Sequence, residues 1–195
     1  KGKTTYAMEG SIFIAGAGVQ WLRDKLNFFK NASETENIVK SLKDNKGVYL
    51  VPAFTGLGAP YWDANARGVL SGLTRDTGPK EIIRATIESV AYQTYDLFEA
   101  MKHDGLRPRL VKVDGGMVMN WFSQFLSNIV DIKVLRPKVQ ETTALGAAFM
   151  AGLQIGVYKS LKDISKNWHL DKNFTPKINS KERNNLVRGW SAAIR

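Results

Sequence analysis

One short stretch of the sequence, residues 110–120, constrains the fold more than any other. It reads Leu-Val-Lys-Val-Asp-Gly-Gly-Met-Val-Met-Asn, so a β-branched segment runs into two glycines and then into a predicted helix. Backbone without a Cβ can come very close to a ligand. The helix would point its free N–H groups and positive dipole end at the same spot. The pattern indicates a nucleotide-binding turn, although a simple tight turn has the same sequence pattern. The helix is recognised by apolar residues at i, i+3, i+4 and i+7, which are Phe122, Phe125, Leu126 and Ile129.

Hydrophobic periodicity over the rest of the chain predicts strands that alternate with helices. Two strand–helix units follow one another between residues 110 and 157, which is typical of a parallel sheet covered by helices. The expected class is therefore α/β, in one domain covering residues 1–195. The predicted strands are 4–10, 48–52, 68–73, 110–114 and 132–136, and the predicted helices are 11–29, a shorter one within 31–46, 79 to before 105, 119–130, 142–157 and 180–194.

Composition narrows the possible partners. The formal net charge of +10 at pH 7 suggests nucleic acid, but the lysines and arginines are scattered and accompany no recognition helix, zinc-finger spacing or aromatic RNA-binding signature. We therefore expect no nucleic-acid role. The sequence has no cysteine, no signal-peptide pattern and no run of about 18 apolar residues. A cytoplasmic protein with no membrane partner is the expectation.

Several long motifs, in order, resemble the FGGY carbohydrate kinases. The segment Gly68-Val-Leu-Ser-Gly-Leu, followed after seven residues by Glu81-Ile-Ile-Arg-Ala-Thr-Ile-Glu88, is similar to the second signature of that family. Other segments are most similar to the members that phosphorylate glycerol, and these are residues 6–13, 15–23, 51–63 and 91–93. The resemblance implies the ribonuclease H-like, actin-like ATPase fold, here as a C-terminal domain that lacks its first strands. It also implies a homo-oligomer.

The resemblance carries specific nucleotide-binding positions onto this chain. Gly16 and Gln20 match the family's contacts on one helix, and Gly116 and Asn120 match those of the Asp-Gly-Gly turn, with Gly115 in the same turn. Gly16 and Gln20 lie one helical turn apart, so they share a face. The glutamine amide can donate or accept a hydrogen bond. From the residues alone, without the family resemblance, we would expect Gln20 to be an exposed surface glutamine and Asn120 to be a helix N-cap.

The sequence lacks the motifs that would carry out phosphoryl transfer itself, and this limits the function expected of the chain. Phosphoryl transfer needs a base, a metal-bound triphosphate and donors to the moving phosphoryl group. In the family, the base, the acceptor-binding residues and the phosphate-binding hairpin precede the matching segment, so no catalytic residue and no metal ligand is predicted here. We expect the ATP- or ADP-binding part of a glycerol-phosphorylating enzyme, inactive alone, with Mg²⁺ held mainly by residues outside this chain and the N-terminal region as partner. Another sugar or polyol kinase of the family and a non-catalytic nucleotide-binding module remain the alternatives.

The missing first strands also bear on stability. An uncovered sheet edge beside residues 4–10 would make the chain marginally stable or self-associating.

Overall fold

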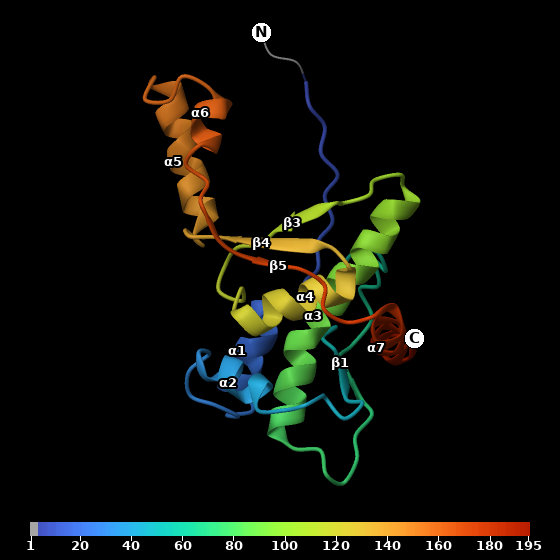
Figure 1. Cartoon of the computed structure of the whole chain (residues 1–195). Coiled ribbons are helices and arrows are strands. Elements are labelled where there is room, and N and C mark those ends of the chain that lie inside the picture. Colours follow the sequence, from blue (N-terminus) through green and yellow to red (C-terminus); the bar gives the residue numbers. More distant parts are fainter. Residues whose placement is uncertain (1–3) are drawn as a thin grey trace.

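A long helix, α3 (Pro79–His103), runs through the centre of the protein in the computed structural model, which describes residues 4–195 (Figure 1). The first three residues of the predicted domain lie outside the described residues. Proline at the first helical position needs no N–H partner, and the Glu81 carboxylate accepts the Gly78 N–H at 2.9 Å. Gly105, at φ +89°, ends the helix. Both boundaries agree with the sequence prediction.

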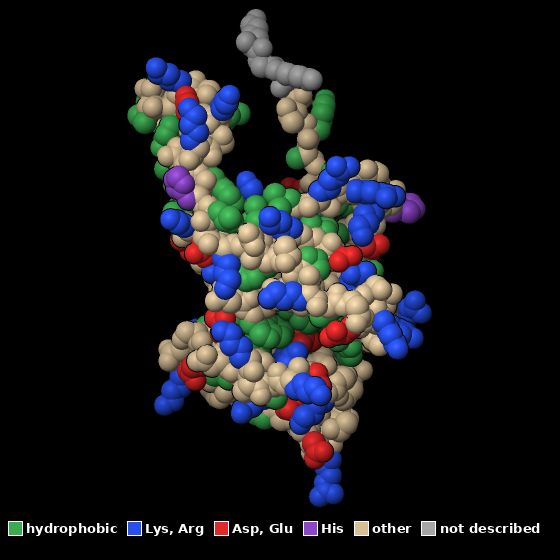
Figure 2. All heavy atoms as spheres, viewed as in Figure 1, with side chains coloured by type: hydrophobic (Ala, Val, Ile, Leu, Met, Phe, Trp, Pro, Cys, Tyr) green, Lys and Arg blue, Asp and Glu red, His purple; other side chains and the backbone are tan. Residues whose placement is uncertain are grey.

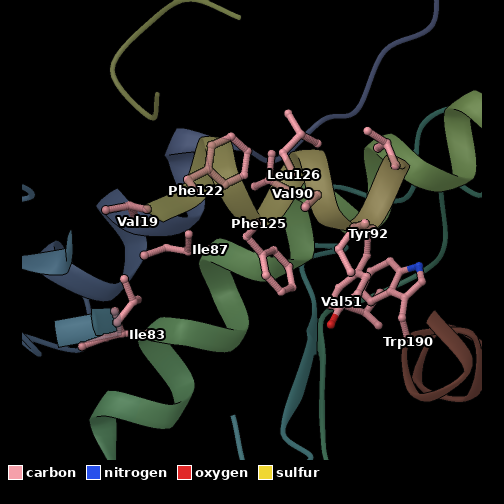
Figure 3. Close-up of a cluster of buried hydrophobic side chains, with 14 of the residues drawn as sticks. Val19, Val51, Ile83, Ile87, Val90, Tyr92, Phe122, Phe125, Leu126 and Trp190 are labelled. Carbon is pink, nitrogen blue, oxygen red and sulfur yellow. The ribbon is translucent and has the colours of Figure 1, made fainter. Parts of the chain in front are cut away.

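The core forms where α4 (Asn120–Val130) and α7 (Ser180–Ala193) pack with α3 (Figure 3). The predicted apolar face of α4 is buried, and so are the apolar residues Ile83, Ile87, Val90 and Ala91 of α3. Aromatic rings join the three helices. The Tyr92 ring stacks on Trp190 with centroids 5.4 Å apart, and meets Phe125 edge to face at 5.7 Å.

Two small sheets flank the helices. Strands β3 (Leu110–Lys112) and β4 (Lys133–Pro137) are parallel, as predicted, and β1 (Tyr49–Val51) pairs antiparallel with β2 (Val69–Ser71). Strand β5 (Leu170–Phe174) was not predicted and pairs antiparallel with β4. The strand reads Leu-Asp-Lys-Asn-Phe, and only Phe174 is buried. Its sequence therefore has no alternation of apolar and polar residues from which a strand could be predicted.

The N-terminal predictions need correction. Residues 4–10 form no strand, because no other segment of the described chain pairs with them, and they extend away from the body in Figure 1. The predicted helix 11–29 is shortened to α1 (Gly16–Asp24). It starts late because the Ser11 carbonyl accepts the Ala59 N–H at 3.0 Å, and it ends early because Asn27 is left-handed at φ +56°. The shorter helix predicted next is α2 (Glu34–Lys40).

Helices α5 (Thr142–Gln154) and α6 (Leu161–Ser165) form an arm that stands apart from the core (Figure 1). The sequence of α5 is rich in alanine and glycine, yet Gly152 is the only buried residue among the thirteen. Figure 2 shows hydrophobic side chains on the surface of this arm. The largest exposed ones are Met150, Ile155, Val157 and Leu161. Large apolar side chains exposed together on one part of a protein are typical of an interaction site or an aggregation liability.

We expect this arm to drive self-association of the isolated chain. Replacing Ile155 and Leu161, which are 77% and 65% exposed, by lysine should lower the association constant because both apolar surfaces would become charged. Sedimentation velocity over a range of concentrations measures this, with circular dichroism as the check on folding. An unsubstituted chain that stays monomeric at every concentration would contradict the expectation.

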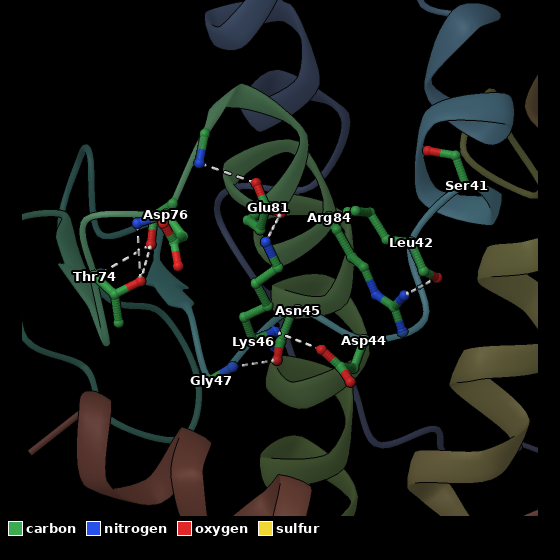
Figure 4. Close-up of polar contacts among 12 residues, drawn as sticks. Ser41, Leu42, Asp44, Asn45, Lys46, Gly47, Thr74, Asp76, Glu81 and Arg84 are labelled. Atoms are coloured by element: carbon green, nitrogen blue, oxygen red, sulfur yellow. Dashed lines mark hydrogen bonds and ion pairs between the residues drawn. The ribbon is translucent and has the colours of Figure 1, made fainter.

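A polar network around Glu88 is buried beside α3, and Figure 4 shows the bond by which its Arg84 reaches the Leu42 carbonyl. Arg84 Nε donates to Glu88 Oε1 at 2.7 Å, and Asn45 Nδ2 donates to Glu88 Oε2 at 2.8 Å. Arg84 Nη1 also donates to the Leu42 carbonyl at 2.6 Å, which fixes the loop after α2. Burial raises the pKa of Glu88 to about 7, although Arg84 and Asn45 both favour its charged form.

The raised pKa makes stability depend on pH with a defined sign. Between the usual carboxyl pKa and about 7, folded Glu88 holds a proton that the unfolded chain has released, so the free energy of unfolding should fall as pH rises through this window. The slope from one group is at most about 1.4 kcal/mol per pH unit. Denaturant titrations at pH 5 and pH 8 should show this loss in the wild type and a smaller one in Glu88→Gln. Equal pH dependence in both proteins would show that Glu88 titrates normally.

Candidate nucleotide-binding site

The main candidate site is a pocket of about 630 Å³ between α1, α3, β3 and the turn that follows β3. Its size is within the range of small-molecule sites. Gly16 and Gln20 line it from α1, and Gly116 lines it from the turn. The Gln20 side chain is exposed and makes no hydrogen bond within residues 4–195. Apolar side chains form much of the remaining wall, including Val19, Val90, Val111, Val118, Phe122 and Leu126.

Two of the pocket glycines are not required by the fold. A Cβ at Gly116 would meet nothing within 4 Å, and one at Gly16 would lie 3.8 Å from Met117 Cγ, an ordinary contact. Neither residue has a positive φ. Gly115 differs because its φ of +84° makes the turn possible, and Gly18 differs because its Cβ would lie 3.0 Å from Thr86 Cγ2. Bare backbone at positions 16 and 116 is therefore left open toward the pocket.

The turn is held by its neighbours. The Gly115 N–H donates to the Gln140 carbonyl at 3.1 Å, and the Thr142 hydroxyl donates to Asp114. These bonds attach the turn to the segment that leads into α5. The turn and α1 approach each other where Met117 faces Gly16. Gly16, Gln20 and Gly116 thus come together around one pocket, whose lining does not include Gly115.

Asn120 lies next to this pocket and does not line it. It borders a shallower hollow of about 470 Å³ that also contains Lys40, Lys172 and Lys177. It is the first residue of α4, whose N-cap is Met119, so the N-cap reading of Asn120 is wrong. Its Oδ1 accepts a hydrogen bond from Arg136 Nη2 at 3.2 Å. Sequence reasoning missed Arg136, because an arginine at the end of a predicted strand carries no motif.

A carboxylate occupies the N-terminus of α4. The Trp121 N–H donates to Glu36 Oε1 at 3.4 Å, and Glu36 also pairs with Lys40 at 2.8 Å. Partial burial raises the pKa of Glu36, but the ion pair with Lys40 and the N–H groups of Trp121 and Asn120 outweigh it and hold the pKa below its usual range. The helix N-terminus that the sequence suggested for an anion therefore already faces a negative side chain.

The described residues provide no protein cage for a metal ion. Within residues 4–195, no group of three or more His, Cys, Asp or Glu side chains could hold one. Asp114 is the only carboxylate that borders the main pocket. The same part of the chain also lacks any helix with the length and apolar character needed to cross a membrane.

Comparisons with known proteins agree on one family. Residues 1–155 match the C-terminal domain of the FGGY family of carbohydrate kinases. The chain is similar to glycerol kinase 1 of Pseudomonas aeruginosa, with 55% identity over 195 residues, and to a glycerol kinase of Alteromonas mediterranea, with 55% identity over 194 residues. These matches cover 100% and 99% of this chain but 40% and 39% of the relatives, so the chain spans about two fifths of their length.

Solved structures show the same similarity in three dimensions. Plasmodium falciparum glycerol kinase with ADP superimposes with a TM-score of 0.83 at 35% identity, over 94% of this chain and 37% of that protein. A ligand-bound xylulose kinase from Lactobacillus acidophilus gives a TM-score of 0.77 at 25% identity, over 95% of this chain and 38% of that protein. The actin-like α/β fold expected from the sequence is confirmed.

We expect the glycines of the site to differ in their effect on stability. Gly18→Ala should lower the free energy of unfolding by about 1–2 kcal/mol, because the new methyl group crowds the buried Thr86. Gly16→Ala and Gly116→Ala should leave it nearly unchanged, since their methyl groups enter open space. Urea denaturation measures all three. A large loss at Gly116 would show that its glycine serves the fold.

Proposed function

The chain belongs to the FGGY family of carbohydrate kinases, and from that premise we propose that it is the adenine-nucleotide-binding C-terminal part of an ATP-dependent glycerol kinase. The complete enzyme would convert ATP and glycerol to ADP and glycerol 3-phosphate. Because the chain spans two fifths of its relatives, the acceptor site and the catalytic base would lie in an N-terminal region outside these 195 residues. The chain alone would bind nucleotide without catalysis.

One observation carries the proposal. Gly16 and Gly116 face one pocket from two different elements, and neither the backbone conformation nor the packing of the chain calls for glycine at either position. Bare backbone on both walls suits a flat ligand that needs close approach, such as a purine nucleoside. The similar glycerol kinase whose structure was solved with ADP supports the same ligand class.

The arrangement of charges indicates how the nucleotide would lie. The adenosine end would enter between α1 and the turn, where the walls are largely apolar. Gln20 in the pocket and Asn120 beside it would offer amide groups to its polar atoms. The Glu36 carboxylate at the start of α4 disfavours phosphate at that helix end. The phosphates would therefore point toward the partner region. Mg²⁺ enters the proposal only as the counter-ion of those phosphates, since the described residues offer no cage for it.

Closure of the two regions would complete the enzyme. The nucleotide held here would meet the acceptor hydroxyl and its base on the other side of a cleft, and closure would exclude water that could otherwise receive the phosphoryl group. With nucleotide binding in this chain and the base in the other region, no catalytic residue is expected in these 195 residues. We also propose a cytoplasmic location, in keeping with the cysteine-free sequence, and a homo-oligomer, as the family resemblance implies.

Calorimetric titration of ADP into the chain tests the nucleotide site. We expect binding by the wild type and a loss of about tenfold or more in Gly116→Ala, because a methyl group between ligand and backbone costs at least about 1.4 kcal/mol of contact energy. Gln20→Ala should also weaken binding. Gly146→Ala is the matched control, since its methyl group likewise meets nothing within 4 Å but lies on α5, outside this pocket. Equal affinities in the Gly116 and Gly146 variants would contradict the assigned pocket.

A chimera tests whether this chain supplies the nucleotide site of a working kinase. The N-terminal three fifths of the Pseudomonas aeruginosa relative, fused before this chain, should release ADP from ATP in the presence of glycerol. The decisive comparison is between chimeras with and without the Gly116→Ala change, which should slow ADP release. ADP release insensitive to that change would overturn the proposal that this chain supplies the nucleotide site.

A further inference from the structure

Arg136 has an unusual partner on the neighbouring strand. In the pairing of β4 with β5, Arg136 lies opposite Lys172 and Pro137 lies opposite Leu170, so Asp171 is an extra residue without a partner. Such a bulge redirects the side chain of the extra residue, and bulges are frequent beside functional sites. Here Asp171 Oδ2 accepts a hydrogen bond from Arg136 Nε at 2.8 Å and lies 2.6 Å from Nη2. The bulge thereby fixes the arginine from the sheet side.

The other side of the Arg136 guanidinium faces the nucleotide turn. Nη1 donates to the Val118 carbonyl at 2.7 Å, and Nη2 donates to Asn120 Oδ1 at 3.2 Å. The side chain is 12% exposed, and its guanidinium lies 5.7 Å from the centroid of the Phe174 ring. A planar group with donors in fixed directions can hold three partners at once, which a lysine ammonium on a flexible stem does far less well. One side chain thus connects the sheet to the end of the turn.

This contact decides which way the Asn120 amide faces. Arginine has only donors, so the amide atom beside it must be the oxygen, and the NH₂ group is turned away from Arg136. Asn120 is half-buried, and held in this way it would present donors and no acceptor to a nucleotide that extends from the main pocket to this position. It would therefore favour an acceptor, such as a purine ring nitrogen or a ribose oxygen, and disfavour an exocyclic amino group at the same place.

From these contacts we infer that Arg136, fixed by Asp171, is a positioning residue that makes Asn120 a dedicated hydrogen-bond donor to the nucleotide. The inference rests on the proposed function and adds to it a role for β5, a strand that contains none of the predicted site residues. Arg136 itself would not touch the ligand. Its effect would pass through the orientation of Asn120 and through the Val118 carbonyl.

Substitutions at Asn120 and Arg136 separate orientation from folding. Asn120→Asp keeps an oxygen toward Arg136 but replaces the outward NH₂ by a second oxygen, so ADP affinity should fall about tenfold or more while stability is retained. Arg136→Gln frees the Asn120 amide to turn and should weaken ADP binding about fivefold to tenfold. Asp171→Ala, at a side chain that is 40% exposed, should give a smaller loss in the same direction. Calorimetry with ADP and urea denaturation are run on the same 195-residue chain.

A matched control and a double-mutant cycle distinguish this role from a structural one. Arg183 pairs with Asp131 at 2.8 Å and is 19% exposed, on α7 and outside the pocket, so Arg183→Gln should leave ADP affinity unchanged. If Arg136 acts through Asn120, then Arg136→Gln should cost much less affinity in an Asn120→Ala background than in the wild type. Equal costs in both backgrounds, or an Asn120→Asp variant with wild-type affinity, would overturn the inference. In that event the proposed function stands as long as Gly116→Ala still weakens ADP binding, whereas a wild type that binds no ADP removes both.

Discussion

The burial of α3 is the constraint on which the rest of the structure depends. From Ile83 to Gln93 its residues are buried on every side of the helix, so polar groups on it must find partners inside the protein. Arg84 donates a hydrogen bond to Glu88 and another to the Leu42 carbonyl. Asn45 donates to the second oxygen of Glu88. Replacing Glu88 by an apolar residue would leave the buried Arg84 guanidinium without its carboxylate partner, and an unpaired buried charge costs about 3–5 kcal/mol. The same bonds attach the loop after α2 to the central helix.

The pocket takes its shape from this central helix. Helices α1 and α4 both pack on α3, and Val90 and Thr94 of α3 form part of the pocket wall between them. The distance between Gly16 and the turn at Gly116 is therefore set by a shared base and not by a direct bond between the two. Walls that rest on one shared helix are typical of preformed small-molecule sites.

The sequence predicts the elements whose own residues carry a clear apolar pattern. Helices α3 and α4 carry apolar stripes, and β3 and β4 are short apolar segments before helices, so their type and parallel pairing follow from periodicity alone. The wrong predictions concern segments whose secondary structure depends on a neighbouring segment of the chain. Residues 4–10 have strand-like residues but no strand beside them, and β5 has a polar sequence that becomes a strand because β4 is available. The start of α1 is likewise decided by the bond between Ser11 and Ala59.

The candidate site shows the same division between what a motif can and cannot reveal. Two adjacent glycines are visible in the sequence, but only the backbone separates Gly115, which needs its positive φ, from Gly116, which does not. Asn120 is visible as a motif residue, yet the direction of its amide follows from Arg136, and Arg136 is aligned by Asp171 at a bulge in an unpredicted strand. A motif therefore indicates which side chain meets a ligand, while its orientation is determined by neighbours with no motif of their own. For this chain, the donor character of Asn120 is a property of the β4–β5 pairing as much as of the turn.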